Sequence, residues 1–85
     1  MREVTWRRRA LTDLETIARH DQRQAERIRD GVARYAEDQG DVVKMKAGSE
    51  VYRLRVGDWR ILFSLEEGGR VMLVQRVLNR RDAYR

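Results

Sequence analysis

Arginine is the side chain whose number and placement in this sequence indicate chemistry. Residues 51–85 carry 8 basic side chains, all of them arginine, against 4 acidic ones, whereas residues 1–50 carry 11 basic and 10 acidic side chains. The guanidinium group keeps its charge at any ordinary pH and matches a phosphate group with two parallel hydrogen bonds. We therefore expect a polyanion as partner. Nucleic acid is favoured over a membrane because no basic amphipathic helix with bulky apolar anchors is present.

Two alternating segments around Gly57-Asp58 predict a β-hairpin that sorts these arginines onto one face. VYRLRV precedes the Gly-Asp pair and WRILFSL follows it, a pattern typical of a two-residue turn. With that turn, Arg55 lies opposite Arg60, and Arg53 lies on the same face of the sheet. The other face is apolar and is expected to lie under the helices; it consists of Tyr52, Leu54, Val56, Trp59, Ile61 and Phe63.

A third strand, VMLVQRV, is expected to add another arginine to this face. If residues 67–69 form a three-residue loop, Glu66 pairs with Arg70, and Arg60 then also lies opposite Arg76. Like charges directly opposite one another cost up to about 1 kcal/mol per pair, so a row of three arginines calls for a reason. The ordinary interpretation is a solvated basic face, and the sharper one is a concavity that binds phosphate groups.

Further basic side chains are candidates for contacts with phosphate groups or RNA. Lys44 and Lys46 share one face if their segment is extended, although simple surface charge explains them equally well. Arg76 and Arg81 lie in and just after the last predicted strand, and we count them with the lysines as RNA-binding candidates.

The first half of the chain predicts two helices. Apolar residues recur at helical spacing over residues 10–18 and again over residues 25–36, and Asp21, with Gln24 three residues later, is a suitable cap between them. Residues 4–6 are expected to form an edge strand, and residues 42–46 a strand or an extended lead-in. We therefore expect one α+β domain over residues 1–85, with an N-terminal helical hairpin packed on one face of a mainly antiparallel four- to five-stranded sheet.

The composition excludes several kinds of site. The chain has no cysteine and a single histidine, so a disulfide or thiolate chemistry cannot be built, and neither a metal nor a cofactor is expected. His20 lies between the predicted helices, where it is best explained as a cation at the end of the first one. The N-terminus, MREVTWRRR, has no apolar stretch, so no signal peptide or membrane anchor is expected and we predict a cytoplasmic location.

Two segments resemble a known family of proteins. KMKAGSEVYRLRVGDWRILFSL, residues 44–65, resembles the central segment of RelE toxins, where a K-L-x-G lead-in precedes a Y-R-(L/I)-R-V-G-D-(Y/W)-R hairpin. RVLNRRDAYR, residues 76–85, resembles the family ending R-V-G-H-R-R-x-x-Y-R. The helical hairpin also fits, so nearly the whole chain resembles the RelE/ParE superfamily of type II toxins.

The resemblance implies a ribosome-dependent mRNA endonuclease, or mRNA interferase, that needs no metal and uses the substrate's own 2′-hydroxyl as nucleophile. The catalytic positions that it implies are Arg53, Arg55, Arg60, Arg80 and Tyr84. Arg60 and Arg80 would stabilise charge on the phosphorane, and Tyr84 would stack on a base or assist proton transfer. Leu78-Asn79 stands where many relatives have Gly-His, and arginine is a very poor proton acceptor, so no general base is obvious.

The superfamily contains members with different targets, so two alternatives stay open. The first is a ParE-type inhibitor of DNA gyrase on the same fold, and the second is an inactive toxin that serves only as co-repressor. In each case the resemblance implies a cognate acidic antitoxin, RelB-like or of another family, in a heterotetramer or larger complex. The ribosome and mRNA are the other expected partners, and no membrane is.

Overall fold

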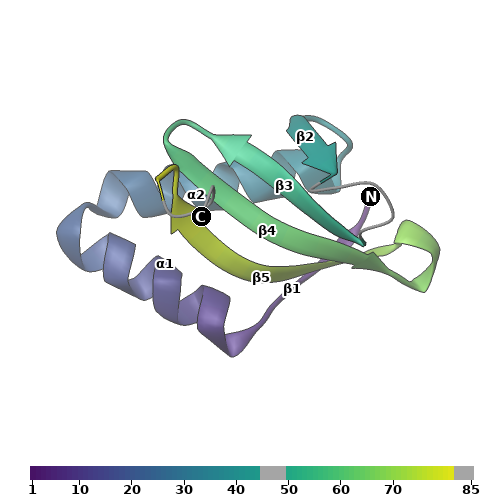
Figure 1. Ribbon diagram of the computed structural model, residues 1–85, viewed down its shortest axis with the longest axis horizontal. Helices are drawn as coiled ribbons and strands as arrows, with labels where there is room; N and C mark the ends of the chain where they lie inside the picture. Colours follow the sequence, from purple (N-terminus) through teal and green to yellow (C-terminus); the bar gives the residue numbers. More distant parts are fainter. Residues whose placement is uncertain (45–49, 82–85) are drawn as a thin grey trace.

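The computed structural model describes residues 1–44 and 50–81, which form two helices and a five-stranded sheet (Figure 1). The sheet order is β1-β5-β4-β3-β2, with β1 parallel to β5 and the other neighbours antiparallel. This arrangement confirms the expected α+β class. The elements are β1 (Glu3–Trp6), α1 (Arg8–His20), α2 (Gln22–Ala36), β2 (Asp41–Lys44), β3 (Val51–Val56), β4 (Trp59–Glu66), the 3₁₀ turn η1 (Glu67–Gly69) and β5 (Val71–Asn79).

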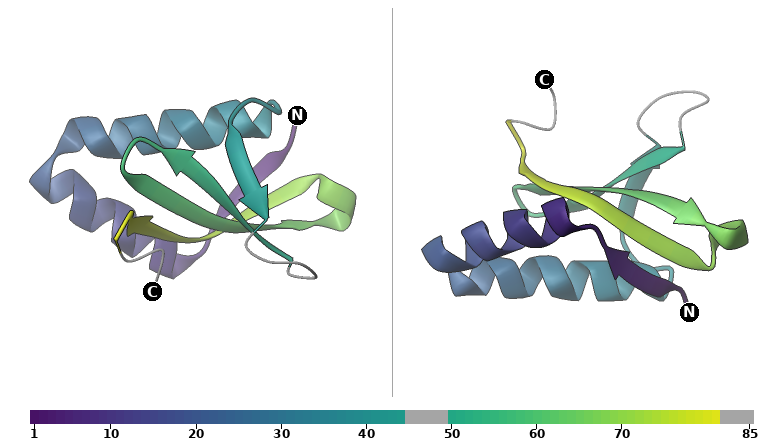
Figure 2. Two further views of the ribbon diagram at one scale, coloured as in Figure 1. Left: turned by 45° about the horizontal axis from the view of Figure 1, so that its top comes forward. Right: turned by 90° about the horizontal axis from the view of Figure 1, so that it is seen from below.

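The two helices form the predicted hairpin and cover one face of the sheet (Figure 2). Asp21 caps α2, since its side chain accepts a hydrogen bond from the backbone N–H of Arg23 at 3.0 Å. Gln24 does not complete the cap, because its side-chain oxygen instead accepts a hydrogen bond from the indole N–H of Trp59 at 3.0 Å. Gln24 therefore ties the helical layer to the sheet. No helix within the described ranges is long and apolar enough to cross a membrane.

The core lies between the helices and the sheet. Each helix places an apolar stripe against the strands, and Phe63 at the centre has no exposed surface and packs against the rings of Tyr35 and Tyr52. Trp6 and Trp59 are partly buried and pack against this core. The buried core residues are Ala10, Leu14, Ile17, Ala25, Ile28, Val32, Leu54, Ile61, Phe63, Met72, Val74 and Val77.

The hairpin between β3 and β4 has the register that its two-residue turn predicts. Val56 lies opposite Trp59, Arg55 opposite Arg60, and the pairing continues to Val51 and Ser64. Gly57 adopts a positive φ of 57°, which suits glycine in so tight a turn. The face assignment of this hairpin is therefore confirmed.

The predicted register between β4 and β5 is wrong. Glu66 lies opposite Val71 rather than Arg70, and a β-bulge at the step between Leu62 and Phe63 shifts the rest of the ladder. As a result, Arg60 lies opposite Leu78, and Arg76 lies opposite Leu62.

The spacing of two valines explains the bulge. Val74 and Val77 are three residues apart, so strict alternation would turn one of them away from the helices. With the bulge, Val74 lies opposite Phe63, Val77 lies opposite Ile61, and both valines are buried. Burying a valine stabilises the fold by roughly 1.5–3 kcal/mol, which outweighs the local loss of ladder pairing.

Gly31, in the middle of α2, lets the helix approach the end of β3. A Cβ added at this position would overlap Cγ2 of Val56. Glycine inside a helix costs about 1 kcal/mol relative to alanine, and the close approach of Val56 explains why it is found here.

We predict that the effect of Gly31→Ala on stability changes sign with the residue at position 56. In the wild-type background the substitution overpacks the contact and should lower the free energy of unfolding by about 1–3 kcal/mol. In a Val56→Ala background the overlap is gone, and the helix preference of alanine should raise the free energy of unfolding by up to about 1 kcal/mol. Urea unfolding of the four variants measures both effects, and a substitution that destabilises equally in both backgrounds would disprove the contact.

Candidate nucleic-acid interface

Three neighbouring strands bring arginines to the end of the sheet where the β3–β4 turn lies. Arg55 on β3 is exposed and lies opposite Arg60 on β4. Arg80 follows β5 directly, and its backbone N–H donates a hydrogen bond of 2.7 Å to the carbonyl of Asp58 in the turn. Figure 1 shows this turn and the end of β5 at one end of the sheet, with the β4–β5 connection at the other. We call the group Arg55, Arg60, Arg80 and Arg81 the turn-end arginines.

Arg60 is the fixed member of this group. It is only 4% exposed, although it lies on the face of the sheet opposite the helices. Its terminal nitrogen donates hydrogen bonds of 2.9 Å to the carbonyls of Gly57 and Trp59, and its Nε has no hydrogen-bond partner among the described residues. Arg60 therefore stabilises the turn, and these hydrogen bonds fix its positive charge just beneath the surface.

A hollow lies where the last strand ends, next to the β3–β4 turn. It has a volume of about 520 Å³ and is lined by Asp58, Asn79, Arg80 and Arg81. Arg80 and Arg81 are exposed, and the backbone N–H of Arg81 donates a hydrogen bond of 3.2 Å to the side chain of Asn79. The hollow is polar and carries two cations against one carboxylate, which suits an anionic group.

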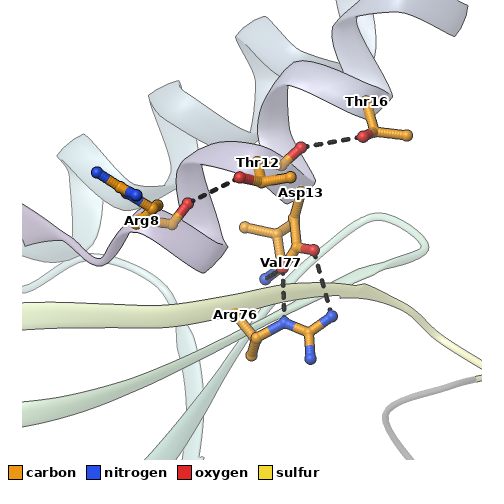
Figure 3. A network of polar contacts seen from close by, with 6 residues as sticks. All are labelled: Arg8, Thr12, Asp13, Thr16, Arg76 and Val77. Carbon is orange, nitrogen blue, oxygen red and sulfur yellow. Dashed lines mark hydrogen bonds and ion pairs between the residues drawn. The ribbon is translucent and has the colours of Figure 1, made fainter.

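Arg76 does not belong to this group, which corrects the predicted row of three arginines. Its Nε and a terminal nitrogen donate hydrogen bonds of 2.8 and 3.2 Å to the carboxylate of Asp13 on α1. The same carboxylate accepts a hydrogen bond of 2.9 Å from the backbone N–H of Val77 (Figure 3). Arg76 lies opposite Leu62, on the face of the sheet away from the helices, and Asp13 of α1 neutralises its guanidinium group at the edge of β5.

Asp13 is a residue that our sequence analysis missed, and its position in the helix carried a signal. Ala10, Leu14 and Ile17 form the buried stripe of α1, and Asp13 shares their helical face by its spacing. An acidic side chain on a stripe that packs against a sheet requires a partner, because a buried carboxylate without hydrogen bonds is costly. Here the partners are Arg76 and the edge of β5.

The remaining predicted residues are only partly gathered at this end. Arg53 lies two residues before Arg55 on β3 and is half-buried. Lys44 is exposed at the end of β2 opposite Tyr52, at the other end of β2 from the residue that pairs with Arg55. Lys46 and Tyr84 lie outside the described residues.

The titratable groups with shifted pKa values do not supply a general base. Burial raises the pKa of Tyr35, which lies on the helical side of the sheet. The hydrogen bond to Asp13 raises the pKa of Arg76, so this guanidinium stays charged. His20 is exposed in the last turn of α1. Within residues 1–44 and 50–81, no group of three or more His, Cys, Asp or Glu side chains could hold a metal ion.

Comparison with solved structures finds the same fold in toxins. The "YoeB/ParE toxin from Agrobacterium tumefaciens" is 20% identical, with a TM-score of 0.73 over 91% of this chain and 96% of that one. The RelBE2 toxin-antitoxin complex from Mycobacterium tuberculosis is 17% identical, with a TM-score of 0.70 over 93% and 98%. The RelB-RelE antitoxin-toxin complex from Methanococcus jannaschii is 23% identical, with a TM-score of 0.64 over 93% and 93%. At these identities the likeness shows the fold.

The fold is thus that of the RelE/ParE superfamily of type II toxin-antitoxin toxins. Residues 4–84 match the family model described as "ParE toxin of type II toxin-antitoxin system, parDE", and the chain belongs to this family. A comparison with curated protein sequences found no significant match.

We predict that Asp13→Ala lowers the free energy of unfolding by about 1–3 kcal/mol, because it removes the acceptor for the Val77 N–H and the counter-charge of Arg76. Asp13→Asn keeps an acceptor oxygen and should cost less. Glu15→Ala, an exposed acidic residue on the same helix, serves as the control and should stay within about 0.5 kcal/mol of wild type. Urea unfolding measures the order of the three stabilities. An Asp13→Ala protein as stable as the Glu15→Ala protein would show that the hydrogen bonds of Asp13 do not stabilise the fold.

Proposed function

We propose that this toxin is an endoribonuclease that cleaves messenger RNA on the ribosome, with the turn-end arginines as its phosphate-binding surface. The observation that carries the proposal is the meeting of Arg55, Arg60 and Arg80 from three neighbouring strands at one end of the sheet. Like charges are brought together here at a cost, and a phosphodiester would offset their repulsion on binding.

In the proposed reaction, the 2′-hydroxyl oxygen of the RNA attacks the adjacent phosphorus while the bond to the 5′-oxygen of the next nucleotide breaks. The products are a 2′,3′-cyclic phosphate and a free 5′-hydroxyl, so the proton lost by the nucleophile is balanced by the one gained by the leaving oxygen. Arg60 and Arg80 would stabilise the negative charge that develops on the phosphorane. Arg53 and Arg55 would hold the backbone, and Tyr84 would stack on a base or assist proton transfer.

Among the residues that the structure describes, the side chains at the proposed site do not include a suitable general base for proton transfer. A guanidinium group stays protonated at neutral pH and cannot serve as a base there. We therefore assign the rate enhancement to positioning of the RNA by the ribosome and to held positive charge, with no metal or cofactor required.

The proposed partners follow from the same surface. A cognate acidic antitoxin, RelB-like or of another family, would neutralise the turn-end arginines in a heterotetramer or larger complex in the cytoplasm. The solved neighbours from Methanococcus jannaschii and Mycobacterium tuberculosis are complexes of this toxin-antitoxin kind. Lys44, Lys46 and Arg81 would add contacts to mRNA or ribosomal RNA.

A second candidate is inhibition of DNA gyrase, which requires binding but no reaction. The match to the ParE family model favours it, and so does the loss of Arg76 from the expected cluster. In that case the turn-end arginines would contact the gyrase–DNA complex.

We predict that the purified toxin cleaves mRNA in a reconstituted translation reaction and that Arg80→Ala lowers the cleavage rate by about 10²–10³-fold, as expected when one charge-stabilising donor is removed. Arg70→Ala is the matched control, since Arg70 is exposed at the opposite end of the β4–β5 hairpin. Primer extension maps the new 5′ ends, and it should find them only when ribosomes are present.

The same preparation discriminates between the two functions. Intact mRNA together with inhibited gyrase supercoiling would overturn the nuclease proposal in favour of the ParE-type one. Equal cleavage by the Arg80→Ala and Arg70→Ala proteins would remove Arg80 from the proposed site.

A further inference from the structure

A second basic hollow lies on the other side of the β3–β4 turn, between α2 and the end of β3. It has a volume of about 380 Å³ and is formed by one face of α2 and the last residues of β3. It exists because β2 pairs with β3 only as far as Arg55, so Val56 and Gly57 have no strand on that side. The end of β3 is thus left open next to the helix.

The face of α2 that borders the hollow has an unusual pattern. Arg27, Gly31 and Arg34 are spaced by four and three residues and therefore share one helical face. Gly31 and Val56 meet closely at the base of the hollow, and the two exposed arginines stand on either side of the glycine.

The charge of the hollow selects an anion. The charged residues that line it are Arg27, Arg34, Arg55 and Asp30, and their formal charges sum to +2. A recess between a helix and a strand holds less water than an open surface, which strengthens its attraction for an anion. Guanidinium forks match phosphate oxygens with paired hydrogen bonds.

The hollow shares one residue with the turn-end arginines. Arg55 lines it, and on the sheet Arg55 is the cross-strand neighbour of Arg60. A single strand of RNA with one phosphate at the turn-end arginines can therefore place a neighbouring phosphate in the hollow.

We propose that the hollow of Arg27, Arg34 and Arg55 is a second phosphate subsite, which binds a backbone phosphate of the single-stranded RNA beside the one that reacts. This inference rests on the proposed function in that RNA is taken as the ligand. Arg27 and Arg34 act in binding and in setting the path of the strand, and they take no part in bond breaking.

The test measures the affinity of the full-length toxin for a short fluorescein-labelled single-stranded RNA by fluorescence anisotropy at several salt concentrations. The double variant Arg27→Gln/Arg34→Gln should bind roughly tenfold more weakly. The slope of log affinity against log salt concentration should be smaller in magnitude by about 0.7, because one phosphate is no longer neutralised. The matched control is Arg23→Gln/Arg29→Gln, which removes the same charge from α2 at exposed positions outside the hollow. The control should change the affinity by less than about twofold. Thermal unfolding confirms that both variants are folded.

Equal RNA affinities or equal salt slopes in the two double variants would overturn the subsite. Another outcome that overturns it is an unchanged affinity for RNA with a loss of binding to a glutamate peptide, because the hollow would then hold an acidic protein segment.

These results are separable from those for the proposed function. If the toxin leaves mRNA intact and only the Arg27→Gln/Arg34→Gln variant binds RNA more weakly, the subsite is supported and the nuclease proposal is wrong. If the toxin cleaves mRNA and the two double variants have equal affinities for RNA, the nuclease proposal is supported and the subsite is wrong.

Discussion

The arrangement of charge on this toxin depends on the β-bulge in β5 and on the carboxylate that holds the strand beyond it. The bulge keeps Val74 and Val77 on the buried face, and Asp13 then accepts hydrogen bonds from the Val77 N–H and the Arg76 guanidinium. β1 pairs with β5 only as far as Val74, so the Val77 N–H would otherwise lie on a free strand edge. One acidic side chain on α1 thereby accepts the hydrogen bond of the Val77 N–H at the strand edge and neutralises Arg76.

The same register determines which cations remain together. Leu78, rather than Arg76, lies opposite Arg60, and the chain reaches the turn at Arg80, whose N–H binds the Asp58 carbonyl. The cross-strand pair of Arg55 and Arg60 repels, by up to about 1 kcal/mol. The two carbonyl contacts of Arg60 offset part of that cost and hold its charge in place. Positive charge that is fixed before a ligand arrives needs little reorganisation when negative charge develops on a phosphate.

The sequence allowed some of these features to be predicted, and physical reasons separate them from the others. The β3–β4 register was predictable because a two-residue turn leaves no freedom in the pairing. The β4–β5 register was not, since a glycine-containing connection can differ by a residue and alternation alone gives no sign of a bulge. The spacing of Val74 and Val77, together with Asp13 on an apolar helix face, would have indicated it.

The site was predictable to a smaller extent than the fold. Arg55, Arg60 and Arg80 meet as their motif positions imply, but the burial of Arg60 depends on its carbonyl contacts with the turn, which no sequence pattern indicates. Family membership indicates the fold, whereas the reaction depends on the side chains that this chain presents on it.

The most direct test of this account is a nuclear Overhauser spectrum that identifies the residue opposite Arg60 on β5. Cross-strand contacts between backbone protons of Arg60 and Leu78, and between those of Leu62 and Arg76, are the predicted result. Contacts between Arg60 and Val77 would show a ladder without the bulge, and contacts between Arg60 and Arg76 would show a different β4–β5 connection; either result would contradict the account of how the turn-end arginines are assembled.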